Sequence, residues 1–166
     1  KDSKTTADFE ANRKRLPREI PVVEVVSQQN TPTLTNQQLV IDAIFGSGLS
    51  RAPEGRVATV IDLMKESDAY VVAVDIPSGL PAEVNDLEEI SNCSIVEANY
   101  TLTFQLPKKS FMHAECFDYT GLVKVLDIGL HEEFLPSINA HDFYTTETVV
   151  KSISKSRSKF SHKGTF

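Results

Sequence analysis

Apolar residues gather in short runs along the chain, and polar or amphipathic segments separate these runs. Leu39–Phe45 and Tyr70–Ile76 are almost continuous apolar runs, as expected of strands that are buried on both faces of a parallel sheet. Tyr100–Phe104 and Gly121–Ile128 carry shorter strand patterns, and the β-branched residues of Ile20–Val26 predict another strand. A sheet is therefore the expected core.

Helical periodicity appears between the strand patterns. Val57, Val60, Ile61 and Met64 lie at positions i, i+3, i+4 and i+7, so Glu54–Ser67 is predicted as an amphipathic helix. Shorter helices are predicted at Thr5–Leu16, near Glu132–Ile138 and at Thr146–Ser154. The recurring order of strand, loop, helix and strand predicts an α/β domain: a doubly wound, Rossmann-like parallel sheet with helices on both faces.

Composition narrows the class of protein. The 166 residues are 40% apolar and 24% charged, which suits one soluble domain, and no apolar run is long enough to span a membrane. The net charge of −6 argues against a general nucleic-acid binder. The start of the chain is too polar for a signal peptide, and the two cysteines lack CxxC spacing. We therefore expect a cytoplasmic protein with reduced thiols and neither a nucleic-acid nor a membrane partner.

Two carboxylates stand at the ends of predicted strands. Asp42 lies within VIDAIFG and Asp75 ends VVAVD, and a loop of small residues follows each. Ligands bind beyond the carboxyl ends of parallel strands, so both loops would face one crevice if these strands are neighbours. The alternative is that each aspartate only caps the turn that follows it. Asp127, in VLDIG, is interpreted as such a turn residue.

Other polar residues give weaker signals. Gly46 and Gly48 form a GxG without the third glycine of the dinucleotide fingerprint. Ser78 lacks a GxSxG context and a nearby His, which argues against a nucleophile. Lys108 and Lys109 follow the third of these strands, either as a solvated pair or as charges that face an anion. The four histidines show no metal-ligand spacing, so a zinc site is not expected.

Four segments, in this order, resemble one family: VIDAIFGSGLSR, VVAVDIPSGL, TLTFQLPKKS and GLVKVLDIGL. They are similar to the second half of the YjeF N-terminal domain, the NAD(P)H-hydrate epimerases, and the resemblance covers residues 1–130. Residues 131–166 resemble a linker and the start of an ADP- or ATP-dependent NAD(P)H-hydrate dehydratase domain. The resemblance implies an isomerase that interconverts the R and S epimers of hydrated NADH or NADPH, for repair by a fused dehydratase, a lyase.

The resemblance also implies roles for individual residues. In that family, the positions that match Asp42 and Ser78 ligate a potassium ion. The position that matches Asp75 contacts the hydrated nucleotide and is the best candidate for proton transfer. The nucleotide-binding loop matches Gly46, Ser47, Gly48, Leu49, Ser50, Arg51 and Ala52. These residue types suit nucleotide binding, because glycines let backbone N–H groups approach a pyrophosphate and arginine pairs with phosphate oxygens.

The sequence departs from the family pattern at one landmark, a GNNGGDG loop that it does not contain. We expect that loop, with the first strand, to precede Lys1, so that this segment alone has little or no epimerase activity. The missing strand would expose a sheet edge, which favours self-association and a homo-oligomer.

Two alternatives stay open. A non-catalytic nucleotide-binding or dimerising scaffold on the same fold has no need to retain Asp42, Asp75 and Ser78 together. A generic nucleotide-binding Rossmann domain would need the glycine fingerprint that is missing here.

Overall fold

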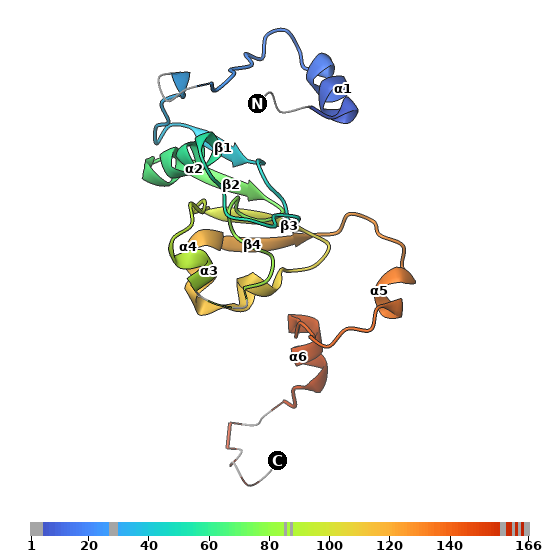
Figure 1. Ribbon diagram of the computed structural model, residues 1–166. Coiled ribbons are helices and arrows are strands. Elements are labelled where there is room, and N and C mark those ends of the chain that lie inside the picture. The colour runs from blue at the N-terminus through green and yellow to red at the C-terminus, as the bar shows by residue number, and fades with distance from the viewer. Residues whose placement is uncertain are drawn as a thin grey trace.

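The structure is a computed structural model, and it describes residues 5–26, 30–84, 86, 88–156, 159–160, 162 and 164. Its body is a parallel sheet of four strands in the order β1-β2-β3-β4 (Figure 1). The strands are β1 Leu39–Asp42, β2 Tyr70–Val74, β3 Tyr100–Phe104 and β4 Leu122–Leu126. This arrangement, with helices in the connections, confirms the predicted α/β, Rossmann-like fold class.

The helices are α1 Ala7–Arg15, α2 Arg56–Glu66, α3 Glu88–Ser91, α4 Phe117–Thr120, α5 Phe134–Ser137 and α6 Glu147–Ile153, with short 3₁₀ helices at Lys109–Met112 and Ala114–Cys116. The predictions at α1, α2, α5 and α6 are confirmed, and the Thr6 hydroxyl caps α1 by accepting a hydrogen bond from Phe9 N. Helices α3 and α4 were not predicted, because four residues are too few to show a helical period.

Helix α2 covers one face of the sheet through its predicted apolar stripe. Ile61 and Met64 are buried against Val71 and Ala73 of β2. Helix α4 lies against the same face, since the hydroxyl of Thr101 in β3 donates a 2.7 Å hydrogen bond to the carbonyl oxygen of Thr120. A second core cluster around Leu80 and Ile95 lies beneath the loop that follows β2.

The prediction of a strand at Ile20–Val26 is wrong. This segment is coil, and the side chains of Val22 and Val23 are 57% and 60% exposed. No strand of the described sheet pairs with it. A β-branched sequence does not form a strand by itself, because the pairing strand and the packing surface supply most of the stability.

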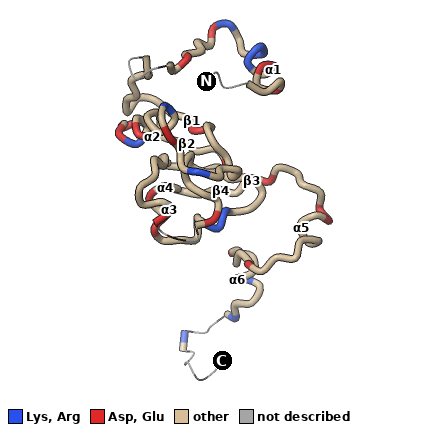
Figure 2. The backbone as a smooth tube through the Cα atoms, in the orientation of Figure 1, with Lys and Arg blue, Asp and Glu red and all other residues tan. Residues whose placement is uncertain are grey.

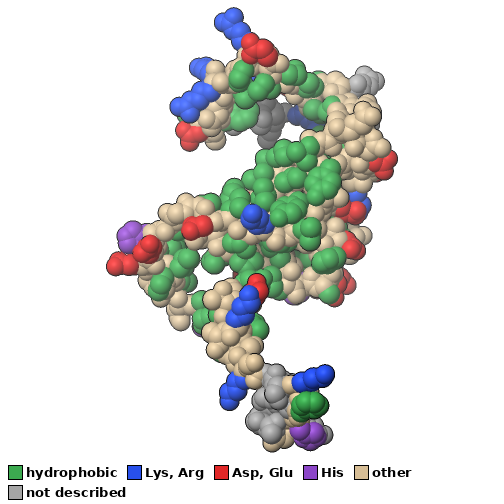
Figure 3. Space-filling model, turned by 180° about the vertical axis from the view of Figure 1, so that it is seen from behind, with side chains coloured by type: hydrophobic (Ala, Val, Ile, Leu, Met, Phe, Trp, Pro, Cys, Tyr) green, Lys and Arg blue, Asp and Glu red, His purple; other side chains and the backbone are tan. Residues whose placement is uncertain are grey.

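The opposite face of the sheet is apolar and exposed. Residues that share this face follow from the strand register: Leu39, Ile41, Tyr70, Val72, Val74, Tyr100, Leu102, Phe104, Leu122, Lys124 and Leu126. The side chains of Leu39, Ile41 and Leu122 are 63%, 55% and 67% exposed. Seen from behind, hydrophobic side chains form a broad patch across the body of the molecule (Figure 3). The expected helical cover of this bare face is not found among the described residues.

Charged residues lie mostly on helices and loops, where acidic and basic side chains are interspersed (Figure 2). The strands carry two charged residues, Asp42 and Lys124. Within the part of the chain that the structure describes, no helix has the length and apolar character needed to cross a membrane.

Candidate functional site

The carboxyl ends of β1, β2 and β3 meet at one edge of the sheet, and the two predicted aspartates lie there. Asp42 is the last residue of β1, and Asp75 follows directly after β2, its backbone N–H bonded to Leu102 O at 2.8 Å. The strands are neighbours, with Asp42 beside Ala73 in the register. Asp42 and Asp75 therefore lie at one edge of the sheet, as their places at the ends of the predicted strands indicated.

Asp42 is enclosed, with 1% of its surface exposed. One carboxylate oxygen accepts a 2.7 Å hydrogen bond from Ser78 N, and the other accepts a 2.6 Å bond from the Ser78 hydroxyl. Ser78 Oγ in turn accepts a 2.9 Å bond from Phe45 N, which fixes the start of the loop after β1. Ser78 is therefore part of a buried polar network and not an exposed nucleophile.

The Asp42 carboxyl group has no cationic partner among the described residues. Buried carboxylates are normally paired or bound to a metal. The polar side-chain atoms here are all oxygens, which suits a hard cation such as potassium, so Asp42 and Ser78 fit the expected ion. The described residues include no cluster of three or more His, Cys, Asp or Glu side chains that could hold a metal ion.

Asp75 occupies a strained turn. Its φ is 69°, and Ile76 N donates a 2.9 Å hydrogen bond to Val74 O across it, which is the pattern of the rarer γ-turn. Positive φ is unfavourable for a residue with a side chain, and such strain gathers at functional sites. The turn ends β2 earlier than the predicted Ile76 and directs the Asp75 carboxylate towards the end of β3.

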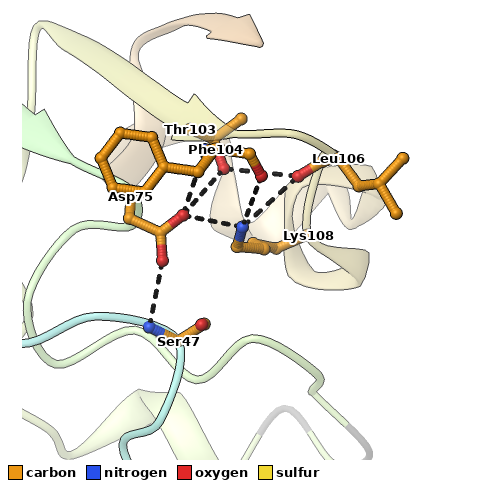
Figure 4. Close-up of polar contacts among 6 residues, drawn as sticks. All are labelled: Ser47, Asp75, Thr103, Phe104, Leu106 and Lys108. Carbon is orange, nitrogen blue, oxygen red and sulfur yellow. Dashed lines mark hydrogen bonds and ion pairs between the residues drawn. The ribbon is translucent and has the colours of Figure 1, made fainter. Parts of the chain in front are cut away.

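The Asp75 carboxylate is held from three sides (Figure 4). Oδ1 lies 2.7 Å from Lys108 Nζ and accepts a 3.2 Å hydrogen bond from Phe104 N, while Oδ2 accepts a 3.3 Å bond from Ser47 N. Partial burial opposes ionisation, but Lys108 and the two N–H donors outweigh it and lower the pKa of Asp75 below its ordinary value. Asp75 is therefore a carboxylate at neutral pH.

The segment Phe45–Ser47 connects the two aspartates. Phe45 N is bound by the Asp42–Ser78 network and Ser47 N by Asp75, so both carboxylates hold one loop. A Cβ at Gly46 would lie 3.5 Å from Asp75 Oδ2, in ordinary contact. The two carboxylates approach this loop from different strands, and no direct contact joins them among the described hydrogen bonds and ion pairs.

Two hollows border the same loop. The larger, of about 480 Å³, is lined by Ile44, Phe45, Gly46, Gly48, Leu49, Ser50, Arg51, Ala52, Pro53, Glu54 and Val57. The smaller, of about 280 Å³, is lined by Leu49, Ser50, Arg51, Ala52, Gly79, Pro81 and Cys93. These volumes are in or near the range of small-molecule sites. Every predicted loop residue except Ser47 lines a hollow, and Asp75 lines neither.

The remaining residues that the sequence singled out lie outside the Asp42 and Asp75 networks. Lys109 Nζ pairs with Asp142 at 3.1 Å, so the adjacent lysines point to different partners. Asp127 accepts a 2.8 Å bond from Gly129 N, as the turn interpretation predicts. Both cysteines remain thiols, and burial raises the pKa of Cys116.

Comparison with known proteins gives a family match. The sequence profile described as "YjeF-related protein N-terminus" matches residues 1–110. The chain is 33% identical over 128 residues to the "Bifunctional NAD(P)H-hydrate repair enzyme Nnr" of Moorella thermoacetica, covering 77% of this chain and 23% of that protein. It is 34% identical to the "NAD(P)H-hydrate epimerase" of Oenococcus oeni, covering 62% of this chain and 47% of that protein. It is 39% identical to the "NAD(P)H-hydrate epimerase" of Lentilactobacillus buchneri, covering 55% of this chain and 41% of that protein.

The parallel sheet and its strand-end carboxylates define a Rossmann-like α/β protein with a loop of small residues at the carboxyl edge. More particularly, the chain belongs to the family of the YjeF-related protein N-terminus, whose profile matches well over half of it. The chain spans less than half the length of the relatives named above.

Proposed function

We propose that this chain is part of an NAD(P)H-hydrate epimerase, which interconverts the R and S epimers of hydrated NADH or NADPH. The family and the names of the relatives support this substrate class. The observation that carries the proposal is the ionised Asp75, held in a strained turn beside the loop of small residues.

A neighbouring turn supports a chemical role for the Asp75 carboxylate. After β3, Gln105 has a φ of 60°, Leu106 N donates to Phe104 O, and the Gln105 side-chain oxygen accepts a 3.1 Å bond from Ile128 N. The same turn is therefore built with a neutral amide. A carboxylate in the equivalent place after β2 is not needed for the turn, so its charge is available for chemistry.

In the proposed reaction, Asp75 accepts a proton as the C6 centre of the hydrated ring opens and returns it as the centre recloses. The loop from Gly46 to Ala52 contacts the nucleotide through backbone N–H groups, and Arg51 pairs with a phosphate oxygen. Its position along both hollows supports that contact.

Asp42 and Ser78 would hold the potassium ion, which neutralises the buried carboxylate. The ion would stabilise the loop through the Ser78–Phe45 contact, and no proton passes through this network. The burial of the Asp42 carboxyl group without a cationic partner among the described residues supports this assignment.

The longer relative named as bifunctional supports a fused arrangement, with residues 1–130 in the epimerase domain and residues 131–166 leading to a dehydratase that uses ADP or ATP. We propose that the whole protein is cytoplasmic and forms a homo-oligomer. Because the chain spans under half of the epimerases compared above, we also propose that the isolated segment is inactive.

The test is epimer exchange by the complete polypeptide that carries this segment. NADPH hydrate enriched in one epimer is added with potassium chloride, and the ratio of R to S is followed against time. Enzyme-dependent exchange, together with a rise in melting temperature on adding substrate, is expected. Substrate-independent melting without exchange would contradict the proposal and favour the dimerising scaffold, for which the bare apolar sheet face is the supporting observation.

A further inference from the structure

Lys108 lies four residues beyond the end of β3, and its Nζ joins the Asp75 carboxylate to the turn around Gln105. Its Nζ is 2.7 Å from Asp75 Oδ1, 3.3 Å from Phe104 O and 3.4 Å from Leu106 O (Figure 4). An ammonium group has three N–H donors, so each has an acceptor. The side chains of Lys108 and Asp75 are 15% and 13% exposed, so the pair is largely shielded from water.

The two oxygens of the Asp75 carboxylate are consequently unequal. Oδ1 receives Lys108, Phe104 N at 3.2 Å and the Thr103 hydroxyl at 3.5 Å. Oδ2 receives only Ser47 N at 3.3 Å among the described contacts, and it faces the loop that borders both hollows. Oδ1 has no lone pair left for a proton, whereas Oδ2 has one.

Lys108 contacts the turn at Gln105 as well as Asp75, through the carbonyl oxygens of Phe104 and Leu106. That turn has a second, neutral support, because the Gln105 side-chain oxygen accepts a bond from Ile128 N. Lys109, the next residue, pairs instead with the exposed Asp142. Within the described residues, Lys108 is the one charged group that acts on Asp75, and the other contacts come from neutral groups of β3 and of the loop after β1.

We infer that Lys108 is the positioning residue of Asp75: it fixes and neutralises Oδ1, so that Oδ2 is the oxygen that exchanges a proton with the substrate. The inference rests on the proposed function. Oδ2 takes the proton of the C6 hydroxyl as the C6–N1 bond opens to an aldehyde and its electron pair passes to the ring nitrogen. Oδ2 returns the proton to the same oxygen as the bond re-forms on the other face, while Lys108 stays paired with Oδ1. The partners of Oδ1 also prevent the carboxylate from rotating during the transfer.

The inference predicts a specific pH effect. The pKa of Asp75 is lowered by Lys108, so the base is ionised, and active, down to a pH below the ordinary value for aspartate. Activity is lost as the pH falls through that lowered pKa. Without the ammonium group the pKa rises, and the acid limb of the pH profile moves to higher pH.

Three variants test whether Lys108 positions Asp75 or only supports the fold: Lys108→Met, Lys108→Arg and the matched control Lys109→Met. In the complete polypeptide, Lys108→Met should reduce kcat by roughly tenfold to a hundredfold with little change in KM, as misplacement of a catalytic group does. Its acid limb should move upward, Lys108→Arg should restore much of the rate, and Lys109→Met should match the wild type. In the 166-residue chain itself, ¹³C NMR should show the Asp75 carboxyl titrating at higher pH in Lys108→Met.

An unshifted Asp75 titration and an unshifted acid limb in a folded Lys108→Met variant would overturn the inference. The proposed function fails separately, if Asp75→Asn exchanges epimers at the wild-type rate. Loss of exchange in Asp75→Asn together with a wild-type profile in Lys108→Met would leave the function standing and remove Lys108 from it. If Lys108→Met does not fold, the Lys108→Arg variant decides the question. An Asp75 titration and an acid limb at the wild-type pH support the inference, and a shift of both to higher pH overturns it.

Discussion

At the scale of single residues, Asp42 and Asp75 occupy matching places and have different environments. Asp42 is buried, and its described partners are the neutral groups of Ser78 and Ile44. Asp75 is largely shielded from water and is paired with Lys108. This difference is the basis for proposing ion binding at Asp42 and proton transfer at Asp75.

Asp42→Asn should remove the response of the protein to potassium. The amide oxygen can still accept from Ser78 N, and the amide N–H can donate to Ser78 Oγ, so the fold is kept while the charge is lost. In the complete wild-type polypeptide, potassium chloride should raise the melting temperature above that in sodium chloride. An equal potassium effect in the variant would contradict the assignment of Asp42.

The sequence predicted which acidic residues stand at the strand ends and not what they bind. The positions of Asp42 and Asp75 follow from the apolar runs before them. The Asp42–Ser78 and Asp75–Lys108 pairs span 36 and 33 positions, and they depend on strand register and on two turns with positive φ. No short-range pattern contains that information, so Thr103 and Gln105 were also missed.

At the scale of elements, the turn after β2 sets the position of Ser78. Gly79 follows it with a φ of 96°, and an added Cβ would lie 2.2 Å from Ser94 O. Only glycine fits against this backbone, because the neighbouring atom belongs to the main chain and cannot move aside alone. The close approach ties the loop after β2 to the segment that leads into β3.

Gly79→Ala should destabilise the chain by about 3 kcal/mol or more, from left-handed strain plus steric overlap. Gly129→Ala is the matched control, because Gly129 also has a positive φ, 71°, and an added Cβ meets nothing within 4 Å. It should cost about 1 kcal/mol from backbone strain alone. Urea unfolding of both variants checks this, and equal losses would show that the contact with Ser94 is unimportant.

Helices and strands could be predicted from the sequence where apolar positions follow the spacing of the element. The β2 run and the α2 stripe have one buried side each, and both were predicted within two residues at each end. Ile20–Val26 has the composition of a strand without a partner, and composition alone gave the wrong answer. The short helices α3 and α4 follow from packing around Leu80 and Cys116, which is a tertiary effect.

At the scale of the whole molecule, the described residues cover one sheet face over β1 to β3 and leave the other face bare. Parallel sheets are normally buried on both faces. Here Ile41 and Leu122 remain exposed, while Val71 and Ala73 on the other face are buried. Exposed apolar area of this kind promotes association and dye binding.

The 166-residue chain should therefore bind a hydrophobic dye and self-associate with rising concentration. The double substitution Ile41→Lys with Leu122→Lys should reduce both, because it places charges on the bare face. Ile153→Lys is the control, since Ile153 is 72% exposed on α6, outside the sheet. Dye fluorescence and sedimentation measure the effect, and an equal reduction by the control would show that α6, and not the sheet, is the adhesive surface.

The central claim is that the Asp75 carboxylate moves the proton, and the most direct measurement is the rate of NADPH-hydrate epimer exchange by Asp75→Asn in the complete polypeptide. Asp127→Asn is the matched control, because Asp127 also follows a strand and only caps a turn through Gly129 N. Asp75→Asn should fold normally, as Gln105 does in the same turn, and should lose about a hundredfold or more in rate, while Asp127→Asn keeps the wild-type rate. Wild-type exchange by a folded Asp75→Asn protein would contradict the account.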